Sequence, residues 1–183
     1  QLLKYRNVFH IQKYYTINNI FPSFGMDNFF ELQEIKLPKT VTKIDDFAFS
    51  SCKKLKTIEI PQNVYNLGRN VFHGCESLEK ISLSSNLKLI PIQTFDGCLN
   101  LKEITLPEKI DSIGSFAFED CSSLVSVSIP EGVTSIEYGA FRGCTSLASV
   151  SIPEGVTSIE HCTFEGCTSL ASVSIPDGVT SIG

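Results

Sequence analysis

The sequence predicts a repeat solenoid, rich in β-strand with short helical or 3₁₀ turns, and three observations support it. Seven leucines recur every 23 residues, starting at Leu32. Six of the seven cysteines follow the same spacing, and only Cys162 is off the series. No insertion or deletion interrupts this register from Leu32 onward. A fixed period of this length is typical of stacked supersecondary units.

Positions within each repeat are numbered here from its leucine. Position 1 of repeats one to seven is Leu32, Leu55, Leu78, Leu101, Leu124, Leu147 and Leu170. Position 21 of the six complete repeats is Cys52, Cys75, Cys98, Cys121, Cys144 and Cys167.

Positions 3 to 6 of each repeat predict a short strand with one buried face. Polar and β-branched residues alternate there, as in Ser126-Val127-Ser128-Ile129. Position 7 is proline in every repeat except the third, which has Ser84. Proline ends the strand because it brings no N–H group to a ladder.

The rest of the repeat predicts a second apolar wall and a turn. Positions 10 and 13 are always Val, Leu or Ile, and a short stretch before the cysteine indicates a helical or 3₁₀ turn. Position 18 is Phe49, Phe72, Phe95, Phe118, Phe141 and Phe164. One unit cannot bury these side chains, so we expect the units to stack with each side chain against its counterpart in the next coil.

The pattern Leu-x-x-Ile-x-Ile-Pro-x-x-Val-x-x-Ile-x-x-x-Ala-Phe-x-x-Cys resembles the BspA-like class of leucine-rich repeat, found in surface proteins of bacteria and anaerobic protists. The resemblance covers Leu32 to Gly183, with small departures at Ser84, Ser51 and Asp120. It implies a right-handed superhelix with a parallel concave sheet. It also implies protein binding or adhesion.

The repeats divide the chain into two parts. Residues 32–183 form the predicted solenoid, with six complete repeats and a truncated seventh. Residues 1–31 are expected to be an N-terminal cap with a degenerate half-repeat that begins near Ile20. The alternatives are a tail of another domain, or a binding patch made by Phe24, Phe29 and Phe30.

The last coil is expected to be open. Ile175, Val179 and Ile182 would face solvent if the chain ended at Gly183. Truncation of a longer array explains this, and end-to-end self-association through the uncapped coil is the alternative.

Composition excludes several classes of protein. A hydrophobic fraction of 42% argues against disorder. No stretch approaches the roughly 18 apolar residues of a membrane span. The net charge of −5 argues against a nucleic-acid partner.

The cysteines are expected to be buried free thiols. A few disulfides between coils, or a metal site, are the less favoured alternatives, since zinc sites use closely spaced cysteine pairs. Cys162 lies beside His161, and an exposed, oxidisable thiol is the favoured interpretation there. No catalytic motif is present, so we expect a chain that is not an enzyme and takes no cofactor or metal.

Function is expected on the exposed strand positions 2, 3 and 5, which form the predicted concave face. In repeats one to four the charges at these positions alternate in sign, and in repeats five to seven the residues are Ser, Ala and Val. Alternating charges on neighbouring strands form cross-strand pairs, which are also typical of a solvated face. They include no aromatic residue and no arginine. The candidate partner-binding residues are Gln33, Glu34, Lys36, Lys56, Thr57, Glu59, Glu79, Lys80, Ser82, Lys102, Glu103, Thr105, Ser126, Ser128, Ser149 and Ser151.

These observations favour a non-enzymatic protein-binding module, and the resemblance to the BspA-like class implies that it lies at a cell surface or is secreted and acts in adhesion or host contact. The alternative is a cytoplasmic scaffold or regulatory subunit that docks another protein.

Overall fold

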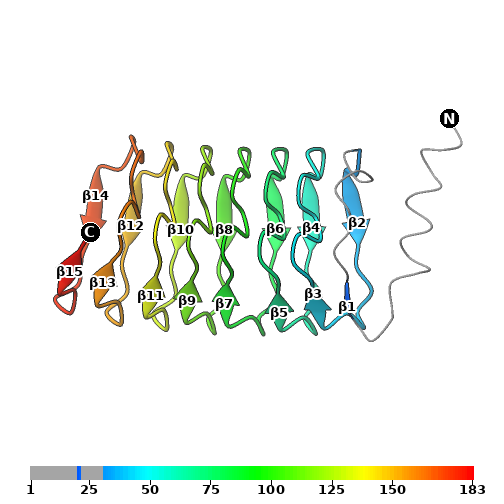
Figure 1. Cartoon of the computed structure of the whole chain (residues 1–183), viewed down its shortest axis with the longest axis horizontal. Coiled ribbons are helices and arrows are strands. Elements are labelled where there is room, and N and C mark those ends of the chain that lie inside the picture. The colour runs from blue at the N-terminus through cyan, green and yellow to red at the C-terminus, as the bar shows by residue number, and fades with distance from the viewer. Residues whose placement is uncertain (1–19, 22–30) are drawn as a thin grey trace, which may run out of the picture.

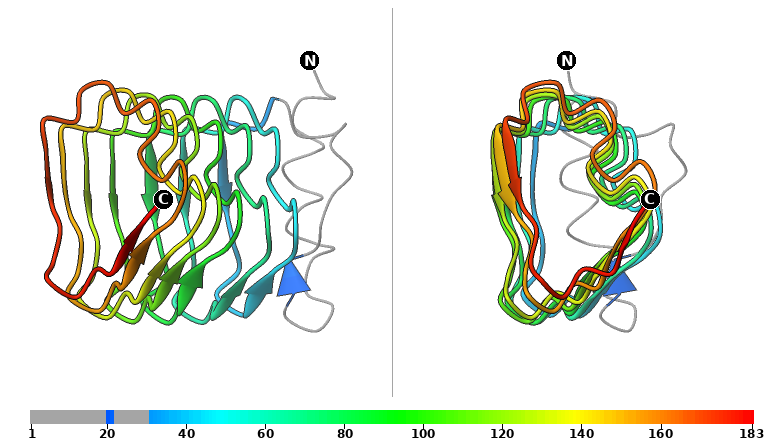
Figure 2. Two further views of the ribbon diagram at one scale, coloured as in Figure 1. Left: turned by 60° about the vertical axis from the view of Figure 1, so that its left-hand side comes forward. Right: turned by 90° about the vertical axis from the view of Figure 1, so that its left-hand side faces the viewer.

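The computed structural model describes residues 20–21 and 31–183. Figure 1 shows the coils stacked side by side along one axis. Viewed along that axis, each coil has three sides (Figure 2). One side carries three-residue strands, the next carries two-residue strands, and the third is a wall of turns. The predicted β-solenoid with a period of 23 residues is confirmed.

The first side is built from parallel strands at positions 3 to 5. Their outer residues are exposed and the middle residue points inward, as the alternating pattern predicts. The pairing follows the period: Ile58 lies opposite Ile35 on one side and Ile81 on the other. These strands are β2 (Glu34–Lys36), β4 (Thr57–Glu59), β6 (Lys80–Ser82), β8 (Glu103–Thr105), β10 (Ser126–Ser128), β12 (Ser149–Ser151) and β14 (Ser172–Ser174).

The second side carries shorter parallel strands at positions 12 and 13. They are β3 (Lys43–Ile44), β5 (Asn66–Leu67), β7 (Leu89–Ile90), β9 (Ser112–Ile113), β11 (Ser135–Ile136), β13 (Ser158–Ile159) and β15 (Ser181–Ile182). Strand β1 (Ile20–Phe21) precedes them and pairs with β3, with Phe21 opposite Ile44. The rest of the predicted cap, including Phe24, Phe29 and Phe30, lies outside the described residues.

The third side differs from the predicted helical or 3₁₀ turn, because the described residues contain no helix. Hydrogen bonds between residues three apart do form, as from the N–H of Cys52 to the carbonyl of Phe49 at 3.1 Å. A helix cannot continue, however, because positions 16 and 20 have positive φ in all six complete repeats. Ser51 and Asp120 adopt at position 20 the same φ as the glycines of the other repeats.

The turn wall forms its own ladder between coils. The N–H groups of positions 16, 18 and 20 donate to carbonyls of the following coil, as from Phe72 to Thr94 at 2.9 Å and from Gly74 to Asp96 at 2.7 Å. These bonds satisfy backbone groups that a helix would have paired internally.

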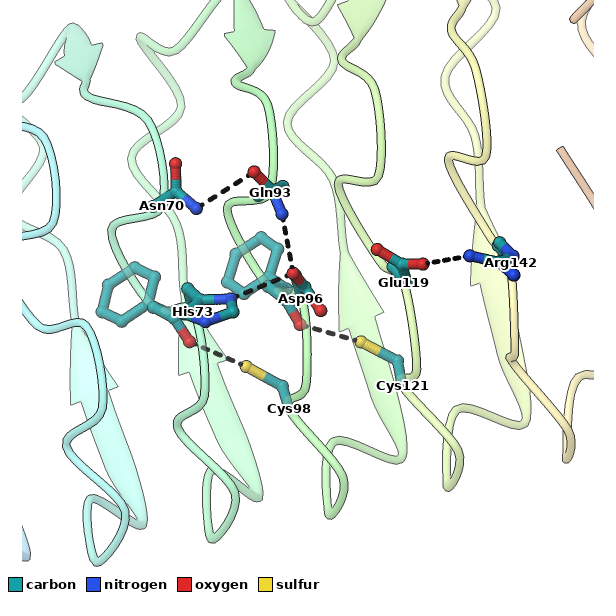
Figure 3. Close-up of polar contacts among 10 residues, drawn as sticks. Asn70, His73, Gln93, Asp96, Cys98, Glu119, Cys121 and Arg142 are labelled. Carbon is teal, nitrogen blue, oxygen red and sulfur yellow. Dashed lines mark hydrogen bonds and ion pairs between the residues drawn. The ribbon is translucent and has the colours of Figure 1, made fainter. Parts of the chain in front are cut away.

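The interior is a set of columns in which each side chain contacts its own counterpart. Neighbouring phenylalanine rings at position 18 stack with centroids 5.2–5.8 Å apart and planes within 17° of parallel. Five of the six cysteines at position 21 are buried, Cys167 is half-buried, and all six are free thiols. Each thiol from Cys75 onward donates to the phenylalanine carbonyl of the preceding coil, as from Cys98 to Phe72 at 3.3 Å (Figure 3).

No helix that could span a bilayer occurs in the part of the chain that the structure describes.

Candidate binding faces

The strand face consists of the side chains at positions 2, 3 and 5. All sixteen candidate residues named from the sequence are exposed on it. Strand pairing brings them into rows, with Glu34, Thr57 and Lys80 in one row and Lys36, Glu59 and Ser82 in another. In repeats five to seven the rows at positions 3 and 5 contain only serine, as in Ser149 opposite both Ser126 and Ser172, and position 2 is Val125, Ala148 and Ala171.

The charged half of the strand face lacks the expected cross-strand ion pairs. Among the described residues, no lysine of this face lies within 4.0 Å of a glutamate carboxylate, although ion pairs form elsewhere, as between Lys53 and Glu76 at 2.7 Å. Strand-face lysines and glutamates are therefore solvated and free to pair with another molecule.

A shallow hollow lies over the first three coils of the strand face. It has a volume of about 1120 Å³, and its rim includes the turn residues Gln62 and Asn63. Six of the sixteen candidate residues line it, namely Glu34, Lys36, Thr57, Glu59, Lys80 and Ser82. The hollow thus joins charged side chains with hydroxyl and amide groups over several coils.

The turn face consists of the side chains at positions 15, 16 and 19 of repeats one to six. Side chains of adjacent coils are hydrogen-bonded along it (Figure 3). The Asp96 carboxylate accepts from the amide of Gln93 and lies 3.0 Å from Nδ1 of His73. The Gln93 oxygen in turn faces the amide of Asn70 at 3.3 Å.

Arg142 holds two glutamates of neighbouring coils. Its Nη1 donates to Glu119 at 3.0 Å and its Nε to Glu165 at 2.8 Å. Burial raises the pKa of the Glu119 carboxyl, and the charge of Asp96 adds to the increase. Hydrogen bonds from the Cys162 thiol and the Arg142 guanidinium lower the pKa of Glu165. The two hydrogen bonds to Glu119 and Glu165 hold the Arg142 guanidinium in place on the surface.

Two aromatic rings lie beside this network. Phe116 and Tyr138 pack edge to face with centroids 5.0 Å apart and planes at 72°. Phe116 covers Gly139, where an added Cβ would come within 2.8 Å of two ring carbons. Tyr138 is still 43% exposed. The structure therefore holds a partly exposed aromatic pair in a defined geometry.

Cys162 is half-buried and in contact with Tyr138. Its sulfur lies 3.5 Å from the tyrosine hydroxyl. The thiol also contacts Glu165, so the side chain that the sequence predicted to be exposed is partly covered by its neighbours. Among the described residues, no group of three or more His, Cys, Asp or Glu is arranged to hold a metal ion.

The turn face is not among the candidate faces that the sequence predicted. Its signal is at position 19, where the residue type changes from repeat to repeat while the neighbouring phenylalanine and cysteine do not. Position 19 contains Ser50, His73, Asp96, Glu119, Arg142 and Glu165.

Three apolar side chains of the last described coil are exposed or half-buried. Ile182 is 65% exposed, Ile175 is 46% exposed, and Val179 is half-buried. End-to-end self-association through this coil stays a prediction.

Fold and repeat together define a parallel solenoid of leucine-rich repeats. The family model of the BspA-type leucine-rich repeat region matches residues 19–147 and 88–183, with six copies of the repeat. The chain belongs to this family. No curated protein matches the chain.

Three solved structures of leucine-rich repeat proteins are similar to the chain. That of a T. pallidum leucine-rich repeat protein is 33% identical, with a TM-score of 0.81, and the match covers 90% of this chain and 77% of that one. One from Eubacterium ventriosum is 31% identical, with a TM-score of 0.68 and coverage of 81% and 39%. A leucine-rich cell surface protein from Faecalibacterium prausnitzii is 30% identical, with a TM-score of 0.56 and coverage of 83% and 34%. The chain therefore spans little more than a third of the length of the last two.

Proposed function

We propose that this chain is a non-enzymatic protein-binding module that acts at a cell surface, in adhesion or contact with a host, and that its partner binds the strand face. The observation that carries the proposal is the set of exposed, unpaired charges along this face. A partner gains the full interaction with these charges, because no intramolecular ion pair has to be broken first.

The family and one of the solved structures support the surface location. The chain belongs to the BspA-type family, and the similar protein from Faecalibacterium prausnitzii is described as a cell surface protein. The free cysteines favour the second candidate, a cytoplasmic scaffold that docks another protein, since thiols persist in reducing compartments. Labelling intact source cells with a membrane-impermeant reagent distinguishes the two, and failure to label the protein would refute the surface location.

A matched pair of variants tests the strand face. The strand-face variant replaces Lys36, Lys56 and Lys80 with serine. The control variant makes the same change in charge off this face, by replacing Lys53, Lys88 and Lys109 with serine. Both are immobilised beside the wild-type chain and incubated with solubilised surface proteins of candidate host cells.

We expect the wild-type chain and the control to retain the same partner and the strand-face variant to lose it. Equal retention by both variants would contradict binding through the strand face. Circular dichroism checks that all three are folded.

A further inference from the structure

We propose that the turn face of repeats four to six is a second binding surface, which docks an extended, arginine-rich segment of another protein. The proposal rests on the Phe116–Tyr138 pair and on the charge that surrounds it, and it is independent of the strand face.

The residue types on the turn face are those that dominate protein interfaces. Aromatic and arginine side chains are enriched among the residues that dominate binding energy in typical interfaces, whereas Lys, Glu and Ser are depleted there. The candidate residues of the strand face are mostly of the second kind. Phe116 and Tyr138 are of the first kind, and they lie on adjacent coils.

These side chains are held in place before any partner arrives. The backbone N–H of Phe116 donates to the carbonyl of Tyr138 at 2.9 Å, and that of Gly139 donates to His161 at 3.0 Å. The ring of Phe116 is packed over Gly139, and Arg142 is fixed between two glutamates. Binding therefore orders few side chains, which lowers its entropic cost.

The charge of this part of the chain selects a cationic partner. Residues 101–183 contain eleven Asp or Glu and three Lys or Arg, a net charge of −8, whereas residues 32–100 contain seven and nine, a net charge of +2. Glu137 and Glu160, at position 14 of adjacent coils, border the turn face, and Glu165 is on it at position 19. Arg142 offsets only one of these carboxylates.

Arginine fits this surface better than lysine does. Its planar, weakly hydrated guanidinium stacks on aromatic rings and donates to carboxylates at the same time. Tyr138 supplies an aromatic side chain that is 43% exposed, and the carboxylate of Glu165, whose side chain is 55% exposed, supplies an acceptor. A segment in extended conformation, with a rise of about 3.3 Å per residue, can run along the row of coils, which lie about 4.8 Å apart.

The test uses the whole chain and fluorescein-labelled peptides, octa-arginine and octa-glutamate. The test variant combines Phe116→Gln and Tyr138→Ser. Both replacements copy residues that the fold already accepts at the same positions, Gln93 and Ser115. The control is Tyr65→Thr, which removes a 62% exposed tyrosine at position 11, outside the turn face.

Fluorescence anisotropy at low ionic strength should show octa-arginine binding and no octa-glutamate binding. The test variant should weaken octa-arginine binding about tenfold, and the control by less than about twofold. The strand-face variant should bind octa-arginine as its charge-matched control, with serine at Lys53, Lys88 and Lys109, does.

Three results would overturn the proposal. The first is absence of octa-arginine binding, and the second is equal binding of octa-glutamate. The third is a test variant that loses no more affinity than Tyr65→Thr, because octa-arginine would then be attracted by the net charge of the chain and not by the aromatic pair. In a separate measurement, sedimentation of the wild-type chain alone should show a monomer. A dimer that the test variant abolishes would instead assign this surface to a second copy of the chain.

Discussion

Phe116 and Phe118 are two residues apart in the same turn, yet they belong to different regions of the molecule. Phe118 is fully buried between the rings of Phe95 and Phe141, and the same residue type recurs in every complete repeat. Phe116 is on the turn face, where other repeats have Asn70, Gln93 or Gly139. In the interior, phenylalanine recurs at position 18 because each ring contacts its own counterpart in the next coil. The surface varies, and its contacts are specific to particular coils.

The largest effect is expected in the interior. Phe118→Ala should lower the free energy of unfolding by about 3–5 kcal/mol, because it leaves a cavity that two parallel rings cannot close. Equilibrium unfolding in urea measures the change. A loss below about 1 kcal/mol would show that the coils collapse around the gap and that the phenylalanine column is not the main source of stability.

The cysteine column predicts that stability falls at alkaline pH. Burial raises the pKa of Cys52 to about 12 and also raises the pKa of the five other thiols at position 21. In the unfolded chain these thiols ionise from about pH 8.5. Their contribution to stability is therefore complete below that pH and is lost as the pH rises toward the raised values.

Each such thiol should lower the free energy of unfolding by up to about 1.4 kcal/mol per pH unit in this range. Urea unfolding at a series of pH values from about 8 to about 10.5 measures the slope. Replacing Cys98 and Cys121 with alanine should make it shallower. An unchanged slope would contradict the assignment of the alkaline loss to buried thiols.

A smaller loss of stability is expected when a glycine of the turn wall is replaced with alanine, and the same replacement in another loop serves as the comparison. Gly97 has φ of 71° and an added Cβ would meet only ordinary contacts, so Gly97→Ala should cost about 1–2 kcal/mol from backbone strain alone. Gly132→Ala is the control, because Gly132 lacks a positive φ and an added Cβ would be no closer than 3.4 Å to its neighbours. Equal thermal midpoints for the two variants would refute the role of the left-handed position.

The period of 23 residues predicts the architecture, the strand positions and the buried columns, because repetition reports directly which side chains stack. It also predicts that all sixteen strand-face residues are exposed. It does not predict the turn wall, since the left-handed φ at position 16 is adopted by Phe47, Gln93 and Cys162 as well as by Gly139. The turn-face contacts between Gln93 and Asp96 or Tyr138 and Cys162 were missed because they depend on residues that differ between repeats.

The most direct test of the division between interior and turn face compares Phe116→Gln with Phe118→Leu, a pair two residues apart, in both urea unfolding and octa-arginine binding. Phe118→Leu should lose more than about 1 kcal/mol of stability and bind the peptide like the wild-type chain. Phe116→Gln should unfold within about 0.5 kcal/mol of the wild-type chain and bind more weakly. The contrary result is a Phe116→Gln variant that loses as much stability as Phe118→Leu and keeps its affinity for the peptide. Both positions would then belong to a single core, and the turn face would not be a separate binding surface.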